Sequence, residues 1–346
     1  MDAFFVSVEL RRRPELRGKP VVVATGTDPG ARGVVMAASY EARKFGVHSA
    51  LPLATAHRRC PQMVLIPRDM ALYREVSGSV MSILREEVQR VEVVGLDEAY
   101  LDLSGSPFPK SDCRRVKHRI RQETGLVCSI GLGPNKLLAK IASDLDKPDG
   151  FYVLEPEGML DAVGDRPATL IPGVGPKTDE RLRAAGIRTV ADLARADAAV
   201  LGRAVGPRLG AELRARANGV DDRTVETERE RKSESVETTF SEDVSDIDVV
   251  HETLDRLSER LCEGMRSGGY RGRTVTVKVR LRPFRTFTRS QTLEAPTRDV
   301  EVIAPMAREL LGRVELDAPV RLVGVGLSAL ERDESQAGDG RLFAEA

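Results

Sequence analysis

Apolar and polar positions follow two different periods along the first 165 residues of the chain. Short runs rich in valine at residues 18–24 and 33–38, separated by a turn-forming segment, are typical of buried strands. Apolar side chains at steps of three and four predict a long amphipathic helix over residues 70–90. Similar patterns predict strands at 91–105 and 126–133, and helices at 113–125 and 135–147. This alternation of strands and helices predicts an α/β or α+β domain.

The pattern changes after residue 165. Residues 166–230 predict short helices joined by glycine-containing turns, and the nearly all-polar residues 224–235 predict an exposed linker. A helix at about 249–266 and several strands follow. In one of them, residues 274–281 (TVTVKVRL), apolar residues alternate strictly with threonine and basic residues, so one face is apolar and the other polar. Residues 333–346 are predicted to be a disordered tail.

Three local features bear on where elements begin and end. The chain opens on MDAFFVSVEL, a run with strand-like or amphipathic character and no strand or cap before it. Ser39 stands where the N-cap of a helix is expected, just before YEARKFG. Gly125 stands where a helix is expected to end, because glycine tolerates the left-handed conformation found there.

Length and composition narrow the class of protein. A chain of 346 residues suggests two to four domains, and 41% hydrophobic with 31% charged residues is ordinary for a globular protein. Acidic and basic residues balance at 53 each, but seven Arg or Lys and no Asp or Glu lie between Gly269 and Leu293. The four separated cysteines predict neither a zinc site nor a disulfide framework. With no membrane span or signal peptide evident, we expect a cytoplasmic protein.

Asp97 and Glu98 are adjacent carboxylates within the strand-like run VEVVGLDEAYLDLSG. A solvated turn or an ion pair is the ordinary explanation of such a pair. In a strand the two side chains point to opposite faces, whereas at a strand end or hairpin bend they can converge on one cation. Two carboxylates, with water and phosphate oxygens, are what Mg²⁺ accepts.

Five segments in order resemble the motifs of the Y-family DNA polymerases, the translesion enzymes, and most closely their DNA polymerase IV branch. They are MDAFFVSVEL, ASYEARKFGVHSALP, GLDEAYLDLSG, GLGPNKLLAKIASDLDKPDGFYVL and IPGVGPKTDERLRAAGI. The resemblance spans almost the whole chain. It implies template-directed addition of dNTPs to a primer 3′ end with two Mg²⁺ ions per active site, and error-prone translesion synthesis in repair and SOS-type damage tolerance. The implied partners are primer–template DNA and dNTPs, and the implied state is a monomer.

The resemblance also implies an α+β multidomain fold, a right-hand polymerase with an additional α/β little-finger domain. The expected domains are a palm (1–10 and 68–165), fingers (11–67), a thumb with a helix-hairpin-helix (166–230) and a little finger (231–332).

Carried onto this chain, the family's catalytic and metal-binding carboxylates are Asp97 and Glu98, with Glu98 beside the primer 3′-hydroxyl. Phe5 falls on the steric gate, whose ring excludes a ribose 2′-hydroxyl, and Phe4 beside it is expected to help bind the dNTP. By pattern alone, both phenylalanines would be core residues. Tyr40 and Arg43 stand three apart on one helix face, and the family uses them on the triphosphate.

Lys147 in DKPDG is the third expected phosphate contact. In IPGVGPK, Gly173, Gly175 and Lys177 are expected to meet DNA, because a tight turn exposes backbone N–H groups at a helix N-terminus; a plain glycine-rich turn is the alternative. The basic face of the strand at 274–281 is expected to contact the DNA backbone; the alternative is a charged face in solvent. Its residues are Lys278, Arg280 and Arg282, with Arg285 and Arg289 nearby. GRLF near the C-terminus resembles a sliding-clamp motif whose opening glutamine is replaced by Asp339.

Two other function classes remain as alternatives: a DNA-binding relic of a polymerase without catalysis, and a two-metal nuclease.

A further expectation concerns the start of the chain. In the family a strand precedes MDAFF and ends in a metal-binding Asp, which would stand at position 0 here. Asp2 lies two residues on, about 6–7 Å along a strand, too far to replace a direct ligand. The resemblance therefore implies weakened or absent activity for the chain as written, with an upstream start or a truncation as the cause.

Overall fold

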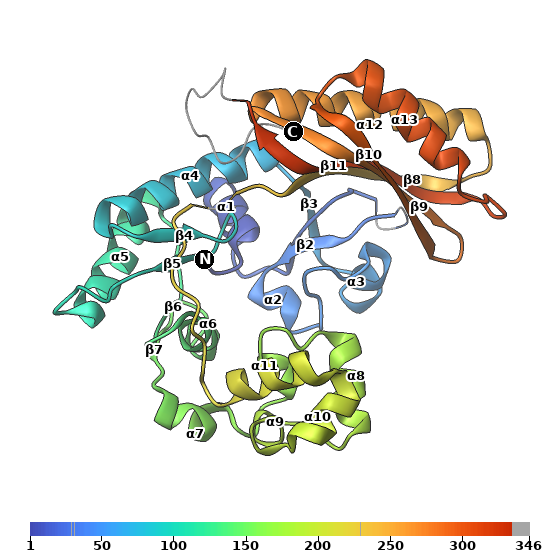
Figure 1. The fold of residues 1–346 in the computed structure, drawn as a ribbon. Coiled ribbons are helices and arrows are strands. Elements are labelled where there is room, and N and C mark those ends of the chain that lie inside the picture. The colour runs from blue at the N-terminus through green and yellow to red at the C-terminus, as the bar shows by residue number, and fades with distance from the viewer. Residues whose placement is uncertain (29, 31, 229, 334–346) are drawn as a thin grey trace. The chain divides into compact units, whose positions relative to one another are not determined.

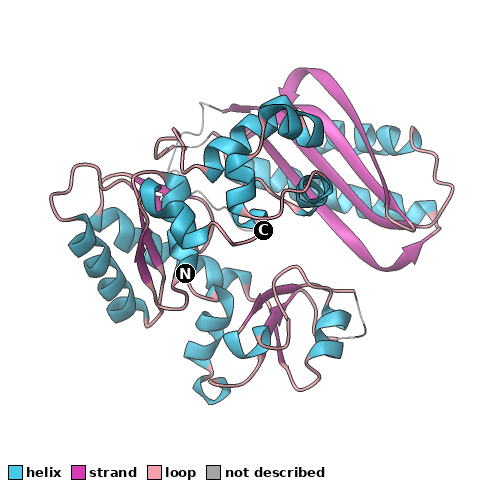
Figure 2. Ribbon diagram, turned by 90° about the horizontal axis from the view of Figure 1, so that it is seen from below, coloured by secondary structure: helices cyan, strands magenta, loops and turns pink. Residues whose placement is uncertain are grey.

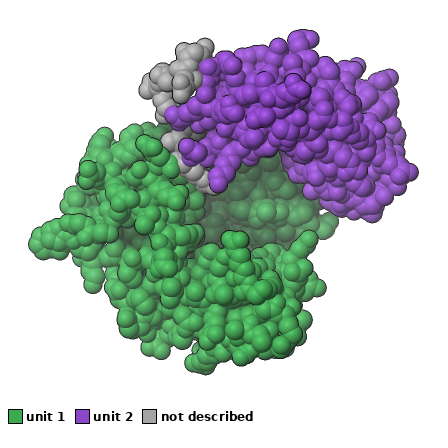
Figure 3. All heavy atoms as spheres, in the orientation of Figure 1, with its two compact units in different colours: residues 1–228 green, residues 229–346 purple. Residues whose placement is uncertain are grey.

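The chain forms two compact units, residues 1–228 and 229–346 (Figure 3). The computed structural model describes residues 1–28, 30, 32–228 and 230–333. The boundary between the units falls inside the segment that the sequence predicts as a linker. Most of the predicted disordered tail, and with it the GRLF segment, lies outside the described residues. Among the helices that are described, none is long and apolar enough to cross a membrane.

A three-stranded sheet organises the segment predicted as fingers (Figure 1). Strands β1 (Val21–Ala24), β2 (Val35–Ala38) and β3 (Val64–Pro67) lie in the order β2-β1-β3, with β2 antiparallel and β3 parallel to β1. All of β1 is buried, as its valine run predicts. The short helix α2 (Tyr40–Arg43) is capped by Ser39, whose Oγ accepts from the Ala42 N–H, so the predicted N-cap is confirmed. Helix α3 (Leu53–Arg59) adds apolar side chains to the same core.

The opening run folds as helix α1 (Phe4–Arg12), so its strand-like interpretation is wrong. Ala3 before it has a left-handed backbone with φ 44°, which turns the chain into the helix. Helix α1 contacts β1, β2 and the long helix α4 (Met70–Glu87), and its apolar side chains share a core with them. Helix α4 confirms the prediction over 70–90, and Asp69 caps it by accepting from the Leu72 N–H.

The predicted strand at 91–105 is instead two short strands, β4 (Val91–Val93) and β5 (Ala99–Leu101), paired as a hairpin. Helix α5 (Pro109–Thr124) packs along α4 and ends at Gly125, whose φ of 68° confirms the predicted helix end. Parallel strands β6 (Ile130–Leu132) and β7 (Phe151–Val153) flank helix α6 (Lys136–Leu145), which Asn135 caps. Together β6, α6 and β7 form a small βαβ unit.

The first unit ends in short helices, as predicted for 166–230. They are α8 (Pro176–Ala184), α9 (Val190–Arg195), α10 (Ala198–Val205) and α11 (Pro207–Ala217), after a 3-10 turn at Ala168–Leu170. A 3-10 turn at Pro156–Gly158 and helix α7 (Met159–Val163) precede this segment, and another 3-10 turn, Pro14–Leu16, follows α1. Their core is continuous with α6, because Leu137, Leu138 and Ile141 belong to the same buried cluster as Leu182 and Leu213. Packing therefore continues across residue 165, and the division into palm, fingers and thumb stays a prediction.

The second unit is a four-stranded antiparallel sheet with two helices (Figures 1 and 2). Its elements are β8 (Ser233–Val244), α12 (Ile247–Ser267), β9 (Tyr270–Leu281), β10 (Arg285–Thr297), α13 (Val300–Gly312) and β11 (Val320–Arg332), and the strand order is β10-β9-β11-β8. The apolar face of β9 is buried against α12 and α13, which confirms the alternation predicted for 274–281. The predicted linker is too long at its C-terminal end, because residues 233–235 pair with β11.

Candidate active site

Asp97 and Glu98 lie in the bend of the β4–β5 hairpin, not within a strand. The bend is held by the N–H groups of Val94 and Gly95, which donate to the Glu98 carbonyl at 3.0 and 3.2 Å. From α4, the Ser77 hydroxyl donates to the Leu96 carbonyl at 2.6 Å. The alternation of a regular strand therefore does not separate the two carboxylates, and this is the hairpin-bend alternative that the sequence left open.

Lys140 of α6 is a side-chain cation beside this pair, and the N-terminal ammonium of Met1 donates to the Asp97 carbonyl at 2.6 Å. Its Nζ lies 2.9 Å from Glu98 Oε1 and 3.9 Å from Asp144 Oδ2. Burial works against its charge, but the hydrogen bond to Glu98 and the charge of Asp144 raise the pKa of Lys140 above its ordinary value. Lys147 pairs with Asp144 from the other side at 2.6 Å. Sequence analysis missed Lys140 and Asp144, although their spacing of four residues in a predicted helix indicates a shared face.

The donor chemistry of the bend fits a divalent cation. Magnesium is commonly held by one or two carboxylates together with water and substrate phosphates, rather than by a cage of protein side chains. Asp97 is exposed and Glu98 is half-buried, so both are accessible to such ligands. In the parts of the chain that the structure describes, no group of three or more His, Cys, Asp or Glu side chains is placed to hold a metal ion.

The two phenylalanines of α1 differ in exposure. Phe4 is only 3% exposed and belongs to the core, whereas Phe5 is half-buried at its edge. The Phe5 ring stacks on Tyr73 of α4, with centroids 4.4 Å apart and planes inclined by 19°. The Tyr73 hydroxyl donates to Glu9 at 2.9 Å, and burial followed by this hydrogen bond raises the pKa of Tyr73. Phe5 is thus backed by the Tyr73 ring and remains partly exposed.

Tyr40 and Arg43 lie together on α2, as their spacing predicts. The Arg43 guanidinium lies over the Tyr40 ring at 4.9 Å, and its Nε donates to the Ala38 carbonyl at 3.1 Å. Burial raises the pKa of Tyr40, and the negative charges of Asp2 and Asp144 raise it further, against the effect of Arg43.

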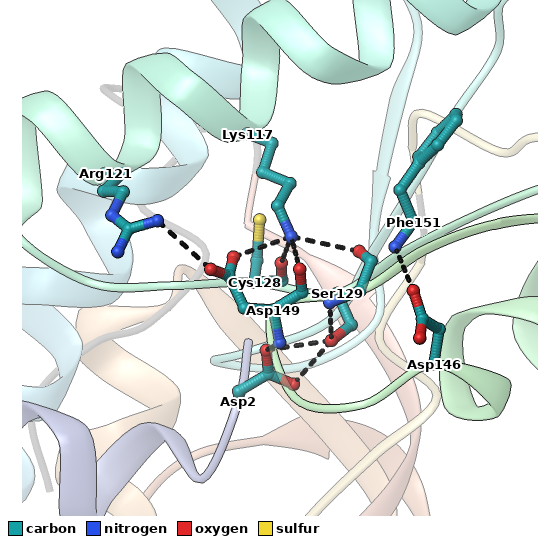
Figure 4. A network of polar contacts seen from close by, with 9 residues as sticks. Asp2, Lys117, Arg121, Cys128, Ser129, Asp146, Asp149 and Phe151 are labelled. Carbon is teal, nitrogen blue, oxygen red and sulfur yellow. Dashed lines mark hydrogen bonds and ion pairs between the residues drawn. The ribbon is translucent and has the colours of Figure 1, made fainter.

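Asp2 is a buried acidic residue at the centre of a polar network (Figure 4). Its carboxylate accepts from the Ser129 hydroxyl and from the Asp149 N–H. Lys117 of α5 binds the same loop through the carbonyls of Cys128, Asp149 and Gly150. Sequence analysis gave Asp2 no positive role, because nothing local indicates a partner 127 residues away.

The predicted helix-hairpin-helix lies at the N-terminus of α8. Gly173 has φ 103°, a conformation that favours glycine, and Arg216 of α11 donates to the neighbouring Pro172 carbonyl at 2.8 Å. Gly175 occupies the N-cap position of α8, and no side chain caps the helix. The first N–H groups of an α-helix have no partner within it, so Lys177 lies in a turn whose backbone donors are available.

The basic residues of the second unit are less free than the sequence suggests. Three of the seven pair with acids from other segments: Lys278 with Glu237 at 2.6 Å, Arg271 with Asp333 at 2.9 Å, and Arg285 with Asp317. Arg280 donates to the Thr286 hydroxyl at 2.9 Å. Within the described residues Arg280 and Arg282 have no acidic partner. Arg282 follows β9 in the turn to β10, so it is not part of the strand face.

Three protein-family profiles match the chain. They are described as impB/mucB/samB family over residues 1–144, impB/mucB/samB family C-terminal domain over residues 231–340, and DNA polymerase-iota, thumb domain, over residues 169–221.

Curated relatives are similar over nearly their whole length. DNA polymerase IV of Methanoculleus marisnigri is 45% identical over 96% of this chain and 93% of its own. DNA polymerase IV of Xanthomonas campestris is 44% identical over 100% of this chain and 97% of its own.

Solved structures of DNA polymerases are also similar to the chain. The Y-family DNA polymerase chimera Dbh-Dpo4(243-245)-Dbh superposes with a TM-score of 0.85 at 26% identity, covering 95% of this chain and 96% of that one. An insertion ternary complex of Dbh DNA polymerase gives 0.65 at 26% identity, over 94% and 96% of the two chains.

Proposed function

The chain belongs to the Y-family of DNA polymerases, in the DNA polymerase IV branch, and from this premise we propose how its residues carry out DNA synthesis. It is a DNA-directed DNA polymerase of translesion synthesis, and its family requires a divalent metal. We infer that the metal is Mg²⁺, with two ions, and that the substrates are primer–template DNA and dNTPs. The observation that carries the proposal is the cluster of cations and acids of α6 beside the Asp97–Glu98 bend.

Asp97 and Glu98 are proposed to hold the ions and to position the primer terminus. When bound, divalent ions neutralise the charge that develops on the phosphates during in-line displacement. Glu98 is proposed to lie beside the primer 3′-hydroxyl and to favour loss of its proton. Because Lys140 already pairs with Glu98, it orients that carboxylate before any substrate binds.

The triphosphate is proposed to bind between α2, the start of α1 and the loop after α6. Arg43 offers forked hydrogen bonds to phosphate oxygens, and Tyr40 a hydroxyl that has no partner among the described residues. Lys147 is proposed to leave its ion pair with Asp144 and to pair with a phosphate of the dNTP. Because the Phe4 ring is buried, Phe4 can bind the triphosphate only through its backbone N–H. That N–H lies at the N-terminus of α1, where anions bind favourably.

Phe5 is proposed as the steric gate. Its ring stacks on Tyr73, and Tyr73 is tied to Glu9, so the ring cannot retreat when a ribose 2′-hydroxyl approaches. Selection of dNTPs then follows from shape, without a hydrogen bond to the sugar.

DNA is proposed to contact each unit through backbone phosphates. In the first unit the donors are the N–H groups at the N-terminus of α8, with Gly173 and Gly175 allowing close approach and Lys177 adding charge. In the second unit the contacts are Arg280 and Arg282, with Lys278 released from Glu237. We propose that the enzyme acts as a monomer in the cytoplasm, with palm, fingers, thumb and little finger divided as the sequence predicts.

Primer extension on a templated DNA hairpin tests the proposal. A polymerase lengthens the primer in the presence of dNTPs and Mg²⁺. A DNA-binding relic only retards the hairpin in a gel, and a nuclease shortens it. Shortening, or binding without extension at any Mg²⁺ concentration, would refute the proposed function.

A further inference from the structure

We propose that Asp2 is a positioning residue for nucleotide binding, which ties the start of the gate helix α1 to the loop that carries Lys147. The inference rests on the proposed function, because it assigns Asp2 an effect through Phe5 and Lys147. Asp2 is 2% exposed and comes from the opening segment of the chain, whereas the loop lies about 147 residues further on.

The carboxylate of Asp2 binds the loop directly. Its Oδ2 accepts from the Asp149 N–H at 2.8 Å, and the Ser129 hydroxyl lies 3.0 and 2.9 Å from Oδ1 and Oδ2. Ser129 in turn accepts from the Gly150 N–H at 3.1 Å. Two consecutive backbone N–H groups, beginning two residues after Lys147, are therefore held by Asp2 and its hydrogen-bonded serine.

The backbone of Asp2 holds the gate helix. Its N–H donates to the Val127 carbonyl at 3.2 Å, and its own carbonyl accepts from the Ser7 hydroxyl at 2.7 Å. Phe5 lies in the turn of α1 between these two residues. One residue thus sets the position of both the sugar gate and the proposed phosphate-binding loop.

Residues of α5 also bind the loop, from the side away from Asp2. The effect of Asp2 on the position of the loop can therefore be tested without unfolding it. Lys117 binds the carbonyls of Cys128 and Gly150 at 3.0 and 3.1 Å and pairs with the Asp149 carboxylate at 2.7 Å. Arg121 also pairs with Asp149, at 3.1 Å. Because these contacts do not involve Asp2, the loop keeps its anchors to α5 when Asp2 is changed. Loss of the Asp2 carboxylate then affects orientation rather than the fold.

The test compares Asp2→Asn and Ser129→Ala with wild type in steady-state primer extension. We expect Asp2→Asn to raise KM for dNTP by about ten-fold, with a smaller change in kcat, because the charged acceptor of two donors is lost. Ser129→Ala should act in the same direction but less, since the Asp149 contact remains, and it carries the test if Asp2→Asn does not fold. Asp192→Asn is the control, because Asp192 likewise accepts from two donors, the N–H groups of Arg188 and Thr189 at the N-terminus of α9, and lies outside the loop.

Two further measurements separate this inference from the proposed function. Hydrogen exchange of peptides covering residues 146–151 should be faster in Asp2→Asn and unchanged in Asp192→Asn; unchanged exchange in Asp2→Asn overturns the inference whatever Lys147 does. In the double variant Asp2→Asn/Lys147→Ala, KM should rise by less than the two single increases combined, because part of the effect of Asp2 passes through Lys147, and fully additive increases overturn the inference. If Lys147→Ala alone leaves KM unchanged, the proposed role of Lys147 fails, and faster exchange then supports only the positioning of the loop.

Discussion

Asp97 and Glu98 are adjacent in the chain but differ in their surroundings. Glu98 is half-buried and paired with Lys140, whereas Asp97 is exposed at the end of the bend. Asp102, at the other end of the same hairpin, pairs with Arg90 at 3.2 Å and has no cation of α6 beside it. Glu92 of β4 is paired as well, with Lys136 of α6 at 2.6 Å. Of the four acids of the hairpin, Asp97 and Glu98 are the two that we propose for chemistry.

We expect Asp97→Ala and Glu98→Ala each to reduce primer extension by orders of magnitude while DNA affinity stays near wild type, because the ions they hold act in the transition state. Single-turnover extension and gel-shift titration measure the two quantities. Asp102→Asn is the control from the same hairpin and should retain extension. Wild-type extension by either alanine variant would show that the site is assigned wrongly.

Replacing the gate should separate sugar selection from catalysis. Phe5→Ala opens space beneath the sugar, so incorporation of rNTP relative to dNTP should rise by roughly 10- to 200-fold. Competition between the two nucleotides at one template position measures the ratio. Tyr73→Phe keeps the stacking partner and should change the ratio far less. An unaltered ratio in Phe5→Ala would make Phe5 a core residue only.

Helices α4 and α5 are joined by a cluster of ion pairs along their contact. Arg115 donates to Glu87 at 2.7 Å, and Arg119 to the other Glu87 oxygen at 3.0 Å. The hydrogen bond from Arg115, aided by Arg119, holds the pKa of Glu87 below its ordinary value of 4.5. A lowered pKa means that the folded state favours the ionised form, so this stability is present above the ordinary value and is lost as the pH falls through the lowered one.

Glu87→Gln should therefore lower the melting temperature at pH 7, by about 2–4 °C if the change costs about 1 kcal/mol. The difference from wild type should shrink as the pH falls from the ordinary value of 4.5 through the lowered pKa of the folded state, because Glu87 is then protonated in both states. Thermal melts between pH 3 and pH 7 follow this directly. Glu86→Gln removes a more exposed neighbour that pairs with Arg119, and it should have less effect. A Glu87→Gln difference that is constant with pH would contradict the ion-pair explanation.

The chain as a whole is electrically neutral, so its affinity for DNA depends on where charges stay unpaired. In the second unit, acids from β8 and from the segment before β11 neutralise Lys278 and Arg285. Arg273, Arg280, Arg282 and Arg289 have no acidic partner among the described residues, and Arg280 and Arg282 are the pair that we propose for DNA. Each phosphate neutralised by the protein adds about 0.9 to the slope of log K against log salt on duplex DNA.

The double variant Arg280→Ala/Arg282→Ala should flatten that slope by about one to two units and weaken binding similarly for all sequences. Fluorescence anisotropy at several salt concentrations measures it. Arg256→Ala/Arg260→Ala removes the same charge from exposed positions of α12, on the helix side of the sheet, and should leave the slope nearly unchanged. A slope indifferent to the first pair would place DNA elsewhere on this unit.

Features that depend on neighbours in the chain were determined by the sequence alone. The buried β1, the span of α4, the N-cap Ser39, the helix end at Gly125 and the apolar face of β9 all follow from periodicity or from the backbone preference of one residue. The family resemblance named the acidic pair, and these residues do lie at one bend. Short-range patterns were less successful at MDAFFVSVEL, which forms a nine-residue helix, and at 91–105, which contains two three-residue strands. Elements this short repeat the apolar pattern too few times for a helix to be told from a strand.

Contacts between distant residues were decided only by the tertiary structure. The pairing of Glu98 with Lys140 and the binding of Ser129 to Asp2 join segments far apart in the chain. Lys278 reaches Glu237 across Gly324, which lies opposite both residues in the sheet and has no side chain between them. A charge pattern read along the sequence cannot include such partners, because ion pairs depend on distance in space. The folded chain therefore settled which of its many charged groups are already paired and which remain free to bind a substrate.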